Sequence, residues 1–177
     1  FFHIDDELTL ENAPKIWEKA NALLQTDDFK PRNLIKNMNV KAVCTTDDPA
    51  SDLKYHKLLK EDEAANGFKT LPAMRPDKLI QIDRDGFGAY LKELGTAAGV
   101  EIHSFNDIIK AMRQRFEFFS SMGGRLSDHS LLTYHFKEAT PAELDAIVAK
   151  GINNEPLTQS EIDQYLTMLL EALMHLN

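Results

Sequence analysis

Disulfides, membrane spans and a surplus of basic residues are all missing from this sequence. Its single cysteine, Cys44, has no partner for an internal disulfide, which fits a reducing cytoplasm. No apolar run approaches the roughly 20 residues that a membrane-spanning helix needs. A formal net charge of −8 opposes binding to nucleic acid and provides no polybasic patch for a membrane surface. We therefore expect a cytoplasmic protein without nucleic-acid or membrane partners.

Several motifs of common enzymes are also absent. The six histidines show neither HxH nor HExxH spacing, so the sequence predicts no metal site within this chain. It has no glycine-rich phosphate loop and no serine nucleophile elbow. The chain opens with Phe1-Phe2-His3, without an initiator methionine, and stops directly after a periodic helix. We expect it to be a piece of a longer protein.

What the sequence does contain is a globular, helix-rich pattern. With 177 residues, 43% hydrophobic and 27% charged, it can bury a core and is expected to form a single domain, residues 1–177. Six segments have apolar residues at helical spacing. Three of them have a hydroxyl cap with an acidic residue three positions later: Ser104 with Asp107, Thr140 with Glu143, and Thr158 with Glu161.

The ends of these helices are predicted from glycine. The Gly123-Gly124 pair should end the first of the three, and Gly151 should follow the end of the second. The last one carries an apolar stripe, from Ile162 to Leu173, that must be buried. The remaining predicted helices span residues 14–25, 53–65 and 82–94, the last weakened by Gly86.

Three short strands are predicted between the helices, over residues 40–45, 68–74 and 125–129. Pro72 disturbs the second of them. Strands that alternate with helices are typical of a parallel α/β sheet or barrel. Three strands cannot close a barrel, so we predict about three strand-helix units of a larger fold, with extra helices.

Polar residues follow all three predicted strands, where parallel α/β folds place their functional groups. Thr45, Thr46, Asp47 and Asp48 follow the first. They could cap the next helix, an interpretation that Pro49 supports. Alternatively, they could bind a polyhydroxylated ligand.

Arg75 follows the second strand and precedes Pro76, which favours extended backbone at the arginine. Its guanidinium could bind a carboxylate through two hydrogen bonds. The alternative is a structural ion pair with Asp77 or Asp48.

Asp128 and His129 end the third strand. Adjacent strand residues point to opposite faces, although a turn at the strand end loosens this restriction. Asp128 could be a general base and His129 a ligand or an acid. Alternatively, Ser127 or Asp128 is a local cap and His129 its neighbour.

Four segments together, "NVKAVCTTDDPASDLKYH", "LPAMRPDK", "DGFGAYLKEL" and "GGRLSDHSL", resemble the uronate isomerase (glucuronate isomerase) family. The resemblance extends over nearly all 177 residues. It implies a distorted (β/α)₈ TIM barrel of the amidohydrolase type, of which this chain is an internal portion. The implied reaction interconverts D-glucuronate with D-fructuronate, and D-galacturonate with D-tagaturonate, by proton transfer through an enediol.

The resemblance also assigns residues. Arg75 matches an active-site arginine and Asp128 an active-site aspartate, with His129 beside it in the motif, while Thr45 to Asp48 are expected to line the same face. A divalent metal such as zinc is implied for the full-length enzyme. Gly124 and Ser130 depart from the family's usual cysteine and glycine.

The family's HxH and "QLHIGA" stretches have no counterpart here, so most metal ligands are missing. We therefore expect the isolated chain to bind no metal and to be inactive. Its uncovered sheet edge should favour a homo-oligomer. Two alternatives remain: a metal-dependent hydrolase of the amidohydrolase type, and a non-catalytic α/β module that binds a sugar acid or a partner protein.

Overall fold

The computed structural model describes residues 2–131 and 133–176, so the terminal residues Phe1 and Asn177 lie outside the description. The chain divides into two compact units. Unit 1 comprises Phe1–Val43 and Lys60–Lys69, and unit 2 comprises Cys44–Leu59 and Thr70–Asn177. The expectation of a single domain stays a prediction.

Unit 1 consists mainly of short helices. They are α1 (Ala13–Leu24), the 3₁₀ helix η1 (Asp27–Phe29), α2 (Pro31–Asn37) and α4 (Glu63–Asn66). The prediction of a helix over residues 14–25 is confirmed. The seven-residue α2 was not predicted, because it is too short to show a helical period. Its Lys36 ammonium donates to the Ala65 carbonyl at 2.7 Å and so ties α2 to α4.

Three helices of unit 2 begin at the predicted capping boxes: α7 (Phe105–Ser121), α8 (Pro141–Ile152) and α9 (Gln159–Met174). In each box the hydroxyl at the cap accepts a hydrogen bond from the backbone N–H three residues later. The acidic side chain at that later position accepts from the backbone N–H of the cap. Gly123, with a φ of +98°, follows the end of α7 as predicted.

Two glycines differ from the predictions. Helix α6 (Phe87–Ala98) begins only after Gly86, whose φ of +89° lies in the left-handed region that other residues avoid. Gly86 therefore starts the helix instead of weakening its middle. Gly151 does not follow the end of α8 but lies inside it, where a Cβ atom would be 2.7 Å from Cγ1 of Ile82. Close packing, and not a turn, requires glycine there.

The helix predicted over residues 53–65 is split into α3 (Lys54–Glu61) and α4, with Asp62 at the break. Leu53 precedes α3 in the left-handed region, at a φ of +52°. The break falls in the acidic run Glu61-Asp62-Glu63, and negative charge is unfavourable at the C-terminal end of a helix. A one-turn helix, α5 (Asp77–Ile80), was not predicted.

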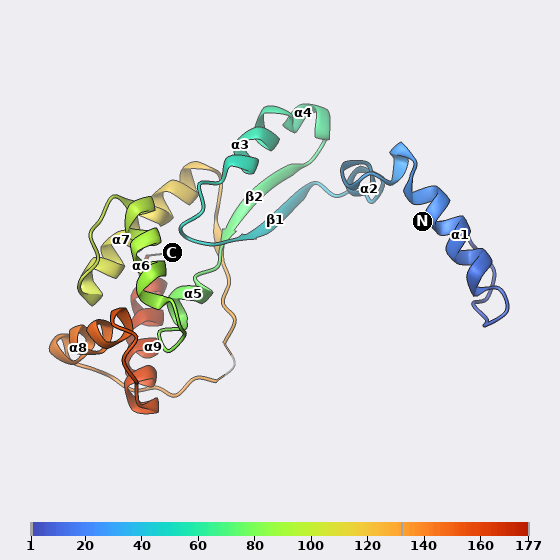
Figure 1. Ribbon diagram of the computed structural model, residues 1–177. Helices are drawn as coiled ribbons and strands as arrows, with labels where there is room; N and C mark the ends of the chain where they lie inside the picture. Colours follow the sequence, from blue (N-terminus) through green and yellow to red (C-terminus); the bar gives the residue numbers. More distant parts are fainter. Residues whose placement is uncertain (1, 132, 177) are drawn as a thin grey trace. The chain divides into compact units, whose positions relative to one another are not determined.

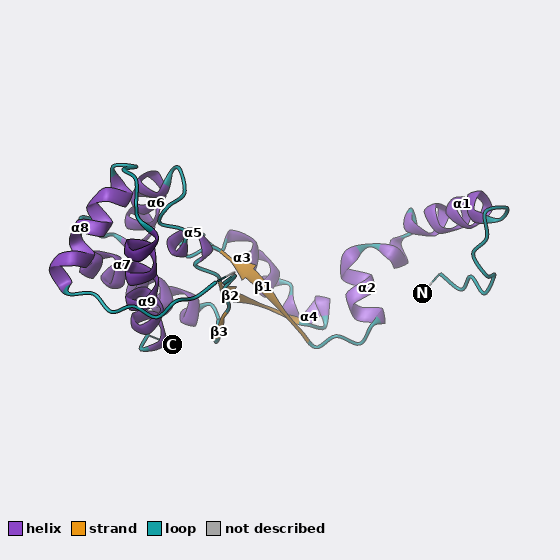
Figure 2. Cartoon of the chain, turned by 90° about the horizontal axis from the view of Figure 1, so that it is seen from below, coloured by secondary structure: helices purple, strands orange, loops and turns teal. Residues whose placement is uncertain are grey.

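The three predicted strands form one sheet in the order β1-β2-β3. They are β1 (Ala42–Asp47), β2 (Lys69–Met74) and the two-residue β3 (Leu126–Ser127). β2 and β3 are parallel, with Met74 opposite Ser127. Figure 2 shows β1 beside β2. Pro72 precedes the two residues of β2 that pair with β3, so its missing N–H interrupts no such pair.

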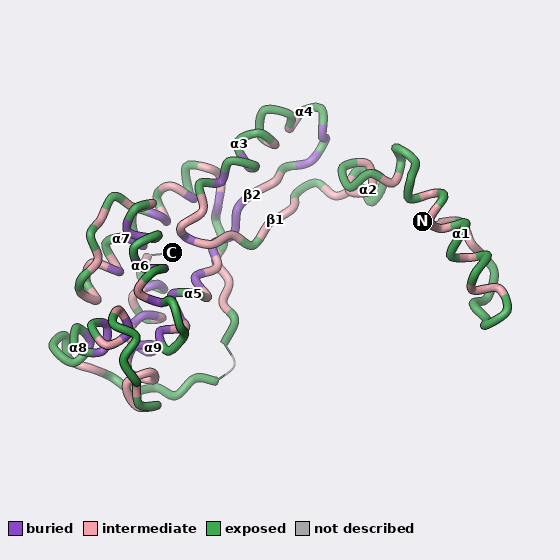
Figure 3. The backbone as a smooth tube through the Cα atoms, in the orientation of Figure 1, coloured by how far each residue is buried: buried purple, intermediate pink, exposed green. Residues whose placement is uncertain are grey.

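The core of unit 2 lies among its long helices. α6, α7, α8 and α9 form one group in Figure 1, and Figure 3 shows the buried residues concentrated in them. The stripe of α9 is buried as predicted, with Tyr165 and Leu169 fully inaccessible. The Tyr165 hydroxyl donates to the Leu79 carbonyl at 3.0 Å, which satisfies its only buried polar group. No helix within the described ranges is long and apolar enough to cross a membrane.

Candidate active site

The carboxyl ends of the three strands meet at one edge of the sheet. The Arg75 N–H donates to the Asp47 carbonyl at 2.8 Å, and the Asp128 N–H donates to the Met74 carbonyl at 3.1 Å. These bonds continue the parallel ladders by one residue beyond β2 and β3. The backbone therefore fixes Arg75 and Asp128 as neighbours, and their side chains leave the sheet at the same level.

The side chains of Arg75 and Asp128 pair directly. Nη2 of Arg75 lies 2.5 Å from Oδ2 of Asp128, whereas Nε of Arg75 is 3.9 Å from Oδ2 of Asp77. The hydrogen bond to Asp128 is also the main cause that raises the pKa of the Arg75 guanidinium above its ordinary value. The pair is partly open to solvent, with 39% and 43% of the two side chains exposed. Exposed ion pairs contribute little to the stability of a fold. The pair is therefore more relevant to the chemistry of a candidate site than to the folding of the chain.

Three enclosed polar atoms at this edge find no hydrogen-bond partner among the described residues: Nε of Arg75, Oδ1 of Asp128 and Nδ1 of His129. Enclosed polar atoms are nearly always hydrogen-bonded, because leaving one unpaired costs about 1–3 kcal/mol. They belong to the three residues for which the sequence predicts catalysis. The three atoms are one guanidinium nitrogen, one carboxylate oxygen and one imidazole nitrogen.

Thr45 makes side-chain hydrogen bonds with Asp47 and with His56 of α3. The Thr45 hydroxyl lies 2.6 Å from Oδ2 of Asp47 and 2.7 Å from Nε2 of His56, a buried residue of α3. Residues alternate along β1, so Thr46 lies on the opposite, more exposed face. The expectation that Thr45 to Asp48 line the face of the site stays a prediction, although Thr45 and Thr46 point to opposite faces of β1. Whether any of them contacts a substrate stays a prediction.

Asp48 links the loop after β1 to two helices. Its Oδ1 accepts from the Ala50 N–H at 2.9 Å and from the Tyr90 hydroxyl at 3.2 Å, and its Oδ2 lies 3.2 Å from the Lys78 ammonium. Burial, followed by the charge of Asp48, raises the pKa of Tyr90. Asp48 thus closes a local turn within the loop and pairs with a lysine, but it does not cap α3, which begins only at Lys54. The alternative of an ion pair between Arg75 and Asp48 is not realised.

His56, Lys78 and Tyr90 also belong to this edge, although the sequence did not predict them there. One signal was available for Lys78, since it lies three residues after Arg75 in the quoted segment "LPAMRPDK". His56 and Tyr90 lie 11 and 42 residues along the chain from the groups they bind. Only the folded arrangement reveals those contacts.

The side chains at this edge do not form a metal site by themselves. Across residues 2–131 and 133–176, no group of three or more His, Cys, Asp or Glu side chains could hold a metal ion. The donor set of this chain therefore does not fit a bound metal without ligands from elsewhere.

Comparison with known proteins identifies the family. The family model described as glucuronate isomerase matches residues 1–177. The chain belongs to the glucuronate isomerase family. It is 79% identical to the uronate isomerase of Latilactobacillus sakei over 177 residues, which are 38% of that protein. It is 54% identical to the uronate isomerase of Lactococcus lactis over 177 residues, 37% of that protein.

Solved structures agree with this assignment. The crystal structure of a uronate isomerase from Thermotoga maritima matches with a TM-score of 0.90 at 31% identity, covering 99% of this chain and 38% of that one. The predicted fold class is confirmed: a helix-rich α/β arrangement with three parallel strands, similar to part of the TIM barrel of glucuronate isomerases. The chain spans little more than a third of the length of these relatives.

Proposed function

We propose that these 177 residues supply part of the active site of a uronate isomerase. That enzyme would interconvert D-glucuronate with D-fructuronate, and D-galacturonate with D-tagaturonate. The observation that carries the proposal is the pairing of Arg75 with Asp128 at 2.5 Å, at the carboxyl edge of the sheet. Family membership along the whole chain supports the same reaction.

Arg75 is proposed to bind the carboxylate of the sugar acid. A guanidinium is planar and binds carboxylates through two parallel hydrogen bonds. Asp128 accepts a hydrogen bond from Nη2 of Arg75, while 39% of the Arg75 side chain remains exposed. The guanidinium therefore keeps donors for a ligand. Its direction is fixed by the hydrogen bond to Asp128 and by Pro76, which follows Arg75 in the chain.

Asp128 is proposed to move the proton. In the aldose, a base removes the proton from C2, the electron pair forms the C1=C2 bond of an enediol, and O1 gains a proton. In the second half, O2 loses its proton, C2=O forms, and C1 is protonated to give the ketose. An ionised carboxylate can accept the proton at one oxygen while the other remains hydrogen-bonded. Asp128 has this arrangement, with Oδ2 bound to Arg75 and Oδ1 unpaired.

The remaining assignments follow from the same proposal. His129 would assist as a ligand or acid, and Thr45, Thr46, Asp47 and Asp48 would bind hydroxyl groups of the hexuronate. A divalent metal of the full-length enzyme, zinc for example, would supply electrophilic assistance and take most of its ligands from outside this chain. We also propose a homo-oligomeric cytoplasmic enzyme, of which this chain alone is inactive. No specific observation favours a hydrolase or a non-catalytic binding module.

The test uses a full-length hybrid enzyme in which these residues replace the matching segment of the Latilactobacillus sakei uronate isomerase, 79% identical over it. Arg75→Lys keeps the positive charge but cannot form the two parallel hydrogen bonds of a guanidinium, so kcat/KM for glucuronate should fall about 100-fold. Asp128→Asn should lower kcat by about 10² to 10⁴ because it removes the base. Arg113→Lys, an exposed arginine of α7, is the matched control and should have no effect.

Two outcomes would contradict the proposal. A folded hybrid that carries the unaltered segment and fails to isomerise uronates would exclude the function. An active hybrid in which Arg75→Lys and Asp128→Asn keep full activity would exclude the assigned roles but not the function.

A further inference from the structure

A second arginine, Arg115 of α7, is buried at 6% exposure. Its side-chain hydrogen bonds all go to backbone carbonyls, and its guanidinium carbon lies 4.3 Å from the centre of the Phe118 ring. Its Nε donates to the Pro49 carbonyl at 2.6 Å and its Nη2 to the Ser51 carbonyl at 2.7 Å. Its Nη1 donates to the Ala97 carbonyl, in the last turn of α6, at 2.8 Å. One guanidinium thus joins the loop after β1 to α6 and α7.

Burying the charged guanidinium of Arg115 carries a free-energy cost of desolvation. Burial lowers the pKa of Arg115, and no carboxylate among the described residues lies within ion-pair distance of it. A well-packed apolar side chain often stabilises a protein core as well as a buried charge does. An apolar side chain cannot provide three directed donors. Arg115 uses two of them on a loop without regular structure, whose carbonyls need partners, and the third on the end of α6.

The loop that Arg115 holds carries Asp48 to the edge of the sheet. From α6, Tyr90 binds the Asp48 side chain at 3.2 Å. From α7, Arg115 binds the backbone one and three residues further on. Asp48 in turn pairs with Lys78 at 3.2 Å, and Lys78 lies on α5, three residues after Arg75. A shift of the loop would therefore move Asp48, Lys78 and the segment that bears Arg75.

We propose that Arg115, together with Tyr90, is a positioning residue for the uronate site. It acts through the loop after β1, keeps Asp48 against Lys78, and so fixes the segment from Arg75 to Lys78 that would bind the substrate carboxylate. It does not contact the substrate itself. This inference rests on the proposed function and adds to it two residues that sequence patterns did not single out.

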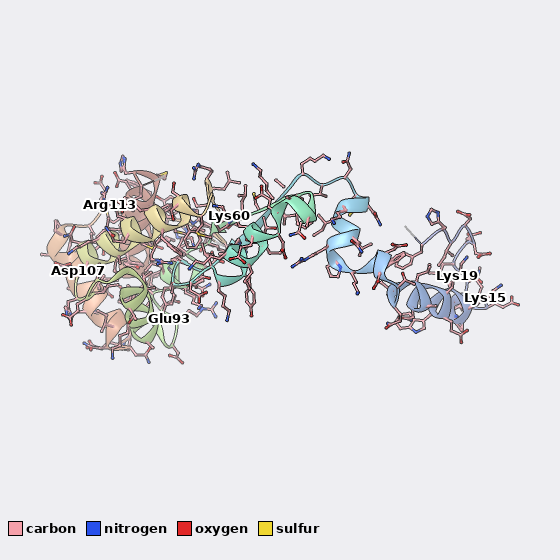
Figure 4. The ribbon with its side chains drawn as sticks, turned by 90° about the horizontal axis from the view of Figure 1, so that it is seen from above. Lys15, Lys19, Lys60, Glu93, Asp107 and Arg113 are labelled. Atoms are coloured by element: carbon pink, nitrogen blue, oxygen red, sulfur yellow. The ribbon has the colours of Figure 1, made fainter. Side chains whose placement is uncertain are left out.

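The experiment compares Arg115→Met and Arg115→Lys in the hybrid enzyme with Arg113→Met. Arg113 lies on the same helix and is exposed, and its side chain makes no hydrogen bond or ion pair with another described residue; Figure 4 shows this side chain on α7. Because small displacements in an active site can cost up to about 100-fold in rate, we expect Arg115→Met to lower kcat/KM about 10- to 100-fold. Arg115→Lys, with fewer directed donors, should retain an intermediate value, and Arg113→Met should match the unaltered hybrid.

The readout separates positioning from folding. The kcat value is divided by the folded fraction, which circular dichroism measures at the assay temperature, whereas KM is independent of the amount of folded enzyme. A merely structural role would reduce the number of active molecules and leave KM and kcat per folded molecule unchanged. Displacement of Arg75 should instead raise KM for glucuronate in the folded Arg115→Met enzyme.

Three outcomes remain decisive. Unchanged KM and kcat per folded molecule in Arg115→Met overturn the inference while the proposed function stands. If neither Arg115 variant folds, Tyr90→Phe decides, because it removes only the hydroxyl that binds Asp48; a kcat/KM within twofold of the unaltered hybrid overturns the inference. An inactive, folded hybrid overturns the proposed function first, and the inference with it.

Discussion

Helices α1 and α9 have similar sequence patterns but different surroundings. Both show apolar residues at three-and-four spacing, and the sequence predicts both as amphipathic helices. In unit 1, none of the twelve residues of α1 is buried, and Trp17 is 72% exposed. In unit 2, α9 buries Tyr165, Leu169 and Leu173 to 1% exposure or less. Figure 3 shows the same contrast.

The contrast separates two kinds of information in a sequence. An apolar stripe predicts a helix and the face that needs a partner, but it does not say where the partner is. For α9 the partners are α7 and α8, in the same unit. For α1 the described residues of unit 1 provide no comparable core. Most of the folding free energy of this chain should therefore come from unit 2.

The largest expected effect tests this contrast directly. Leu169→Ala should destabilise the 177-residue chain by about 2–5 kcal/mol, because Leu169 is fully buried and its removal leaves a cavity. Leu10→Ala in unit 1 is the matched control and should change stability by less than about 0.5 kcal/mol, since Leu10 is fully exposed. Urea unfolding followed by circular dichroism measures both. Equal losses from the two substitutions would contradict the contrast.

A smaller effect is expected from a pair of glycines. Gly151→Ala in unit 2 should cost about 1–3 kcal/mol, because the new Cβ would lie 2.7 Å from Cγ1 of Ile82 and 3.1 Å from Cδ1 of Phe87. Gly67→Ala in unit 1 meets no atom within 4 Å. Its cost should be only the strain of a φ of +72°, about 1–2 kcal/mol. A neutral Gly151→Ala in the same urea assay would show that α8 can move away from Ile82.

The capping boxes and Gly151 also show how far the sequence predicts the fold. Capping boxes depend on residues three positions apart, so the starts of α7, α8 and α9 were predicted correctly. The role of Gly151 was predicted wrongly because it depends on close contact with Ile82, which is distant in sequence and lies in the turn between α5 and α6. Local chemistry could be predicted, and contacts across the fold could not.

The candidate site divides in the same way. Arg75 and Asp128 could be predicted, because parallel strands bring their carboxyl ends to one edge and the residues that follow them are known. The environment of Thr45 could not be predicted, because it depends on His56 covering that face of β1. Arg115 was equally hidden, since its partners are backbone carbonyls, which any residue provides.

The smallest predicted effect is on the pH dependence of stability, and it compares one ion pair from each unit. In unit 2, hydrogen bonds from Lys150, then from the Thr158 cap, lower the pKa of Glu161 from 4.5 to about 2. In unit 1, Lys30 lowers the pKa of Asp27 without a helix cap to assist it. A carboxylate whose pKa is lower in the folded state stabilises the fold above its unfolded pKa. That contribution is lost as the pH falls through the folded value.

Glu161→Gln should therefore lower the thermal midpoint of the chain at pH 7. The difference from the unaltered chain should shrink between pH 4.5 and 2, the range over which Glu161 gains its proton. Asp27→Asn should change the midpoint less at every pH, because its partner is the exposed Lys30 alone. Thermal unfolding from pH 7 to pH 2 measures both. A constant difference for Glu161→Gln across that range would mean that the cap acts through its geometry and not through the charge of Glu161.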